Sequence, residues 1–99
     1  MNIKLVRLVT GEDILTEYTD AGTDAVFTNP LIVYIRPTET GVPSVGMNQW
    51  VPYASSKEFT IDKDKIVFVA DAAEDLTSQY DKVFGSGIIM PSQGLVGVK

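Results

Sequence analysis

Residues 3–20 constrain the fold most strongly, because their pattern predicts two short β-strands joined by a tight turn. Residues 3–9 are dominated by β-branched and aliphatic side chains, which favour strands. Thr10 and Gly11 supply the turn, since glycine readily adopts positive φ. Residues 12–19 then alternate between apolar and polar side chains, as a half-buried strand does. We therefore expect this pair to open an antiparallel sheet.

The rest of the chain predicts further strands with short connections. Strand candidates occupy residues 25–36, 44–53, 59–61 and 66–70. A bend or a sheet edge is expected at Asn29-Pro30, because proline cannot donate a hydrogen bond to a neighbouring strand. Residues 62–65 (Asp-Lys-Asp-Lys) predict a tight turn. These features predict a mostly β protein, namely a small five-stranded antiparallel barrel.

One helix is predicted, over residues 71–84. Asp71 is a suitable N-cap and Glu74 follows three residues later, which is the capping-box pattern. An apolar stripe at helical spacing then includes Ala73, Leu76, Tyr80, Val83 and Phe84. We expect residues 1–85 to form one domain, and the apolar tail 86–99 to dock on it or on a neighbouring subunit.

Composition excludes several classes of function. The chain has no cysteine and no histidine, which removes disulfides, thiolate metal sites and the commonest general base. Its net charge is −5 and its eight Lys and Arg residues are scattered, so no basic stripe follows the chain. No apolar run approaches the ~20 residues of a membrane-spanning helix, and a cytoplasmic protein that does not bind membranes is expected.

Acidic side chains do not form a recognisable catalytic or metal site. Glu12, Asp13 and Glu17 fit the solvated face of a strand. Asp62, Asp64 and Asp71 do not have the spacing of a cation-binding loop. We therefore expect no enzymatic activity, no metal and no cofactor.

Two segments together resemble an Sm-like (LSm) protein, most closely a divergent phage-type member. The first pattern runs through Val6, Leu8, Gly11, Ile14, Tyr18 and Asp20. The second runs from Ile61 through residues 66–69. The resemblance implies an Sm-like (SH3-like) barrel. This chain differs from the family in having Thr16 where a glycine bends the second strand, and in having its helix after the strands rather than before them.

The resemblance also implies assembly into a ring of identical subunits. In this family, strand four of one subunit pairs with strand five of the next, and segments 44–53 and 66–70 would be those edges. The run of five apolar residues at 66–70 independently implies burial on both faces or pairing with another chain. The expected interface residues are Val45, Met47, Trp50, Val51, Ile66, Val67, Phe68 and Val69.

A single-stranded RNA site at the pore is the other expectation that the resemblance carries. The corresponding positions here are Asp20, Asp24, Asp62, Lys63 and Lys65. Thr23-Asp24 falls where the family has Asn, and Asp62-Lys63 replaces Arg-Gly, so recognition of uridine would be altered or weakened. For Lys63 and Lys65 the alternative to a place at the pore is a charge-balanced turn. The aromatic residues that could stack on bases are Tyr18, Phe27, Tyr34, Trp50 and Tyr53, although core packing is the ordinary role of such residues in a small barrel.

Two functions therefore remain in competition. One is a homo-oligomeric ring that binds single-stranded RNA with altered or weakened base recognition. The other is a structural ring that contacts protein partners and has lost RNA binding. The acidic composition and the missing Arg-Gly pair favour the second, and the two family segments favour the first.

Overall fold

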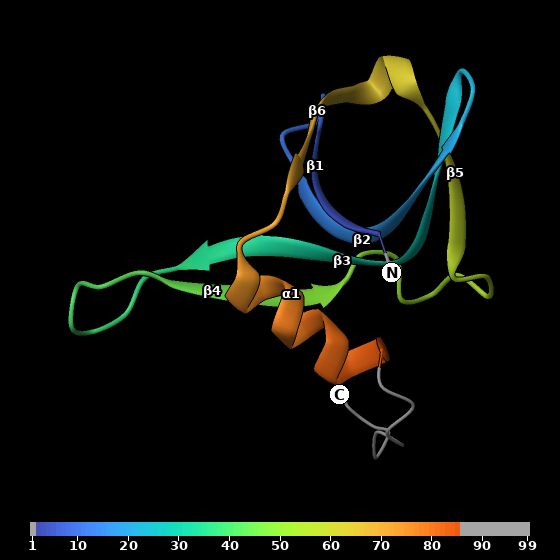
Figure 1. Cartoon of the computed structure of the whole chain (residues 1–99). Helices are drawn as coiled ribbons and strands as arrows, with labels where there is room; N and C mark the ends of the chain where they lie inside the picture. The colour runs from blue at the N-terminus through green and yellow to red at the C-terminus, as the bar shows by residue number, and fades with distance from the viewer. Residues whose placement is uncertain (1, 86–99) are drawn as a thin grey trace.

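Six strands form one antiparallel sheet that curls into a barrel in the computed structural model, which describes residues 2–85 (Figure 1). The strands are β1 (Ile3–Leu8), β2 (Asp13–Ala21), β3 (Asp24–Arg36), β4 (Ser44–Gln49), β5 (Glu58–Asp62) and β6 (Ile66–Asp71). A 3₁₀ turn, Lys63–Lys65, joins β5 to β6, and helix α1 (Glu74–Tyr80) continues into a π-helical turn, Asp81–Gly85. The sheet order is β4-β3-β2-β1-β6, with β5 also paired to β3.

Strand β3 bends in the middle and pairs with a different strand on either side of the bend. Its residues 24–28 pair with β5, and residues 31–36 pair with β4. Between them Asn29 has φ of +53°, a conformation that asparagine tolerates better than most residues, and Pro30 follows it. The register between β2 and β3 shifts at the same level, between Leu15 and Glu17. The predicted bend at Asn29-Pro30 is confirmed.

The predicted barrel with one C-terminal helix is confirmed, but it has six strands rather than five. All six predicted strand segments are observed, and the segments at 44–53 and 59–61 are separate strands, β4 and β5, that pair with successive halves of the bent β3. The predicted strand 44–53 is wrong in its last four residues, since β4 ends at Gln49. Trp50 leaves the strand and packs into the barrel, where its backbone N–H donates to the Pro30 carbonyl at 3.2 Å.

Two hydrophobic clusters lie on opposite faces of the curved sheet. The first fills the barrel and is built around Val6, Leu8, Ile14, Ala25 and Phe27. The second lies between the sheet and α1 and is built around Leu15, Leu31 and Tyr80. Strand β2 separates the two clusters. The predicted half-buried alternation of this strand is therefore wrong at its centre, where Ile14, Leu15 and Thr16 are all fully buried.

Helix α1 begins later than predicted and without the predicted capping box. Its N-cap is Ala73, and no side chain accepts a hydrogen bond there. Asp71 is instead the last residue of β6, where its carboxylate pairs with the Lys4 ammonium of β1. Pairing with Lys4 therefore replaces capping at this position. The predicted helix 71–84 is observed as α1 followed by the π-helical turn.

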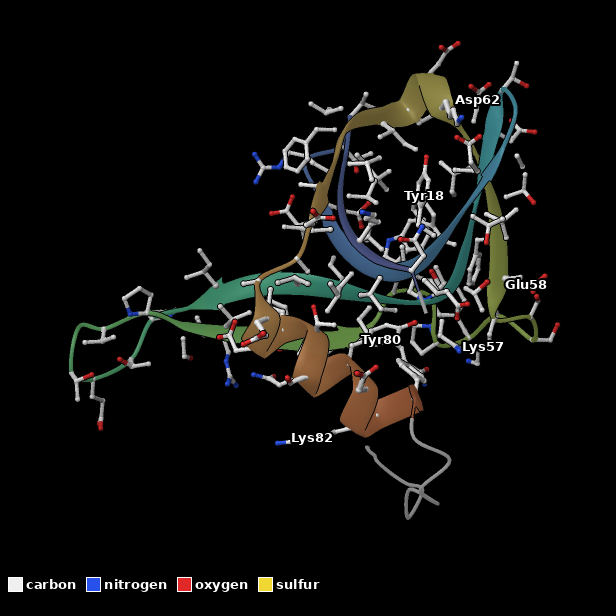
Figure 2. The ribbon with its side chains drawn as sticks, viewed as in Figure 1. Tyr18, Lys57, Glu58, Asp62, Tyr80 and Lys82 are labelled. Atoms are coloured by element: carbon white, nitrogen blue, oxygen red, sulfur yellow. The ribbon has the colours of Figure 1, made fainter. Side chains whose placement is uncertain are left out.

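Tyr80 attaches the helix to the bend in the sheet. Its side chain is fully buried and points from α1 toward β3 (Figure 2). The hydroxyl lies 3.0 Å from the carbonyl oxygens of both Thr28 and Asn29, so that its one proton can be donated to either, and it accepts from the Glu17 N–H at 3.3 Å. Those backbone groups lie where the register of the β2–β3 ladder shifts. One phenol therefore contributes hydrogen bonds to backbone groups on both strands at the bend.

Two further expectations concern the C-terminal tail and membrane-spanning helices. The predicted apolar tail, 86–99, lies outside the described residues. Among residues 2–85, no helix is long and apolar enough to cross a membrane.

Candidate functional site

The two segments that sequence analysis assigned to an RNA site lie next to each other at one end of the barrel. They are the β2–β3 turn, residues 20–24, and the 3₁₀ turn with its cap, residues 62–65. Asp24 and Asp62 are direct neighbours in the β3–β5 ladder. The Lys63 backbone N–H donates to the Thr23 carbonyl at 3.1 Å. We call these nine residues the loop cluster.

Local sequence explains how each half of the loop cluster is shaped. Gly22 adopts φ of +74°, and its N–H donates to the Asp20 carboxylate at 3.2 Å, which closes the β2–β3 turn. Asp62 caps the 3₁₀ turn by accepting from the Asp64 N–H at 2.9 Å. Both aspartates therefore shape the backbone in addition to carrying charge.

Lys63 is engaged by Asp20 rather than left free for a ligand. The Lys63 ammonium lies 2.7 Å from the Asp20 carboxylate, and both side chains are partly exposed. This hydrogen bond lowers the pKa of Asp20 and raises the pKa of Lys63, so each group holds its charge more firmly. The positive charge that would contact a phosphate is thus partly neutralised within the chain.

The loop cluster carries more negative than positive charge. It holds four carboxylates (Asp20, Asp24, Asp62 and Asp64) against two ammonium groups (Lys63 and Lys65). Its formal charge of 2 − 4 = −2 opposes the binding of phosphates. Among residues 2–85, no group of three or more acidic side chains is arranged to hold a metal ion.

Lys65 lies on the same 3₁₀ turn but borders the mouth of the barrel. Its carbonyl accepts from the Val9 N–H at 2.8 Å, and the residue lines an open pocket of about 340 Å³. Leu8, Glu12, Trp50 and Ile61 are among the other residues that line this pocket. Glu12 accepts hydrogen bonds from the Trp50 indole at 3.1 Å and from the Thr10 hydroxyl at 2.8 Å. The sequence predicts a solvated strand face for Glu12, and no local pattern signals its hydrogen bonds with Thr10 and Trp50.

Most of the aromatic candidates for base stacking are used in packing. Tyr18, Phe27, Trp50 and Phe59 form a row, with neighbouring ring centroids 6.1, 6.3 and 5.7 Å apart. Tyr34 lies over Gly46, where an added Cβ would come within 2.5 Å of its ring. Tyr53 is 88% exposed and lies in the segment between β4 and β5. Of these aromatic candidates, Tyr53 has the ring most accessible for base stacking.

The predicted interface residues fall into two groups. Exposed side chains are Val45 on β4 and Val67, Phe68 and Val69 on β6. Met47, Trp50 and Ile66 instead pack against the two clusters, and Val51 is half-buried beside a cavity of about 10 Å³. Burial of the 66–70 run on both faces, one of the two predicted explanations, is wrong for the single chain. The other explanation, pairing with a second chain, stays a prediction.

The ion pairs predict loss of stability in acid. Asp13 pairs with Arg7 at 2.7 Å, and hydrogen bonding from Arg7, Lys63 and Lys4 lowers the pKa of Asp13, Asp20 and Asp71 respectively. A lowered folded-state pKa gives stability that is present above the ordinary value of 3.8 and is lost as the pH falls through the folded value. We therefore expect the free energy of unfolding, measured by urea titration, to fall below about pH 4. In D13N, the free energy of unfolding should fall less steeply below about pH 4. An equally steep fall in D13N would contradict the role of the Arg7–Asp13 ion pair.

Comparison with known proteins gives one family match. A family model described as an Sm_like domain matches residues 5–81, from the third residue of β1 to the first residue of the π-helical turn. The match includes both halves of the loop cluster and strands β4 and β6, the two ends of the strand order. No curated protein matches the chain.

Proposed function

This chain belongs to the Sm-like family, and from that membership we infer that it assembles into a homo-oligomeric ring with the loop cluster at the pore. We propose that single-stranded RNA contacts this cluster with weakened and altered base recognition. The observation that carries the proposal is the juxtaposition of residues 20–24 and 62–65, joined by the Lys63–Asp20 ion pair. These are the segments from which the family builds its nucleotide site.

Assembly is supported by the two ends of the sheet. Among the described residues, β4 and β6 each pair with a single strand, so each presents one edge without a partner. Strand β6 also exposes three apolar side chains in succession, Val67, Phe68 and Val69. An apolar strand edge of this kind favours pairing with another strand. Pairing β6 of one copy with β4 of the next copy would give both unpaired strand edges a partner.

Native mass spectrometry tests the assembly directly. We expect a closed ring of several identical subunits at micromolar concentration. A monomer under these conditions would contradict the ring, and the loop cluster would then have no pore to line. The number of subunits follows from the same measurement.

If the Lys63–Asp20 ion pair weakens RNA binding, removing that pair should raise the affinity for RNA. Asp20→Asn deletes one negative charge and frees the Lys63 ammonium. One unit charge at contact distance is worth about 1 kcal/mol in water, so affinity for short oligouridylate or oligoadenylate should rise about three- to tenfold at low salt. Fluorescence anisotropy with both oligonucleotides measures the change and the base preference.

The matched control is Asp71→Asn. Asp71 forms an equivalent exposed ion pair with Lys4, away from the loop cluster, so this variant changes the net charge equally. If D71N raises affinity as much as D20N, the effect is general charge and the loop cluster is not the site. If neither oligonucleotide binds either variant at low salt, RNA binding is excluded.

A structural ring that contacts proteins is the second candidate. It is favoured by the four carboxylates of the loop cluster and by the engagement of Lys63. A protein partner that remains bound to the assembled chain after nuclease treatment would support it. Absence of RNA binding together with ring formation is the result that separates this candidate from the first.

We propose a non-catalytic role in either case. The chain has no histidine or cysteine, and its strongest carboxylate interactions are ion pairs and turn caps rather than partners of a nucleophile. A cytoplasmic location and a viral source stay predictions.

A further inference from the structure

We propose that the C-terminal segment of this chain pairs, as an added antiparallel strand, with the free edge of β4. The pairing residues would be 87–90, Gly-Ile-Ile-Met, which include two β-branched side chains in succession. Strand addition to an exposed sheet edge satisfies backbone groups that otherwise face water. The occupant is therefore a part of the same molecule.

The first support is the place where the described chain ends. Phe84 and Gln49, the last residue of β4, line the same small cavity together with Trp50 and Val51. Strand β4 and the helical segment after β6 both end on the same side of the molecule (Figure 1). A segment that continues from Gly85 back along β4 would therefore run antiparallel to it.

The second support is reach. Fourteen residues, 86–99, follow Gly85. An extended chain of that length covers about 46 Å, whereas the six residues of β4 extend about 20 Å. Residues 87–90 come directly after Ser86, so only a short connection would separate the π-helical turn from the pairing residues. A tethered segment of this kind acts at an effective concentration in the millimolar range.

The third support is the character of the β4 edge. Among residues 2–85, β4 pairs only with β3. Its Val45 is 46% exposed, and Met47, on the same face, already packs in the cluster beneath α1. An apolar strand beside β4 would extend that cluster. Pro91 sets a natural end to the pairing, because it has no N–H to donate.

Strand addition at this edge would regulate assembly. The β4 edge is the one that β6 of a neighbouring copy uses in the proposed ring, so the tail and the neighbour would compete for it. This consequence rests on the proposed function, whereas the pairing of residues 87–90 with β4 does not.

The test uses the full-length chain with paired proline substitutions. I88P together with I89P removes both adjacent N–H donors, one of which must face β4. S92P together with Q93P makes the same change beyond the pairing residues and serves as the control. Both are made in a V67K chain, in which ring assembly through β6 is blocked. Hydrogen exchange is then measured at the amides of residues 44–49.

We expect alternating β4 amides to exchange at least about tenfold faster in I88P/I89P than in either S92P/Q93P or V67K alone. Equal exchange in the three chains would overturn the pairing, and so would equal acceleration by both proline pairs. With Val67 intact, I88P/I89P should strengthen association about tenfold, and unchanged or weaker association would overturn the competition. If the intact chain is a monomer, the ring proposal fails, but the exchange measurement still decides whether the tail pairs with β4.

Discussion

Replacing Tyr80 with phenylalanine is expected to lower the free energy of unfolding by about 1–3 kcal/mol. The ring would remain in place, so the change removes little apolar contact. It removes instead the hydroxyl that donates to the Thr28 or Asn29 carbonyl and accepts from the Glu17 N–H. The Thr28 carbonyl also accepts from the Thr16 hydroxyl at 3.1 Å and keeps that partner, but the Asn29 carbonyl and the Glu17 N–H lose the Tyr80 hydroxyl in a site that α1 covers. The loss of hydrogen bonding by buried polar groups is costly.

Urea unfolding monitored by circular dichroism measures this loss, and Tyr53→Phe is the matched control. Tyr53 is 88% exposed, so deleting its hydroxyl should change stability by less than about 0.5 kcal/mol. If Y80F and Y53F are equally stable, the Tyr80 hydroxyl does not hold the helix to the bend.

Alkaline pH gives Tyr80 a second signature. Burial raises the pKa of its phenol from 10.0 to about 12, which favours the protonated form in the folded state. A raised folded-state pKa gives stability that is fully present below the unfolded value and is lost as the pH rises through the folded value. Stability should therefore fall between pH 10 and 12, and Y80F should show a smaller fall than Y53F over the same interval.

Replacing Val67 with lysine is expected to weaken ring assembly at least about 100-fold. Val67 is 59% exposed on β6, so the single chain tolerates a charge there, but a neighbouring strand would enclose it. Burial of an unpaired ammonium costs several kcal/mol, and each 1.4 kcal/mol is tenfold in affinity. Native mass spectrometry and light scattering over a concentration series measure the shift toward monomer.

The control for V67K is Val42→Lys. Val42 is 67% exposed and lies in the connection between β3 and β4, outside both strand edges. It tests whether one added positive charge alters assembly in general. A V67K chain with the oligomeric mass of the wild type would show that β6 is not the interface, and loss of assembly in both variants would leave the interface unassigned.

The loop cluster shows how far spacing along the chain can predict which residues lie together. The positions of Asp20, Asp24, Asp62 and Lys63 were predicted from the family pattern, and the structure brings these four residues together. The ion pair between Lys63 and Asp20 was not predicted, because the two residues are 43 positions apart and their contact depends on how β5 pairs with β3. The same argument applies to Glu12 and Trp50 at the barrel mouth.

Local preference and the period of apolar residues were enough to predict the strands, the bend at Asn29-Pro30 and the C-terminal helix, apart from the end of β4 and the start of α1. They did not predict that β2 is buried on both faces, that Asp71 pairs with Lys4 instead of capping α1, or that the Tyr80 hydroxyl bonds to the backbone at the bend. Burial and hydrogen-bond partners depend on which distant segments meet in the folded chain. A local pattern specifies which conformation a segment prefers, but not which surface will cover it.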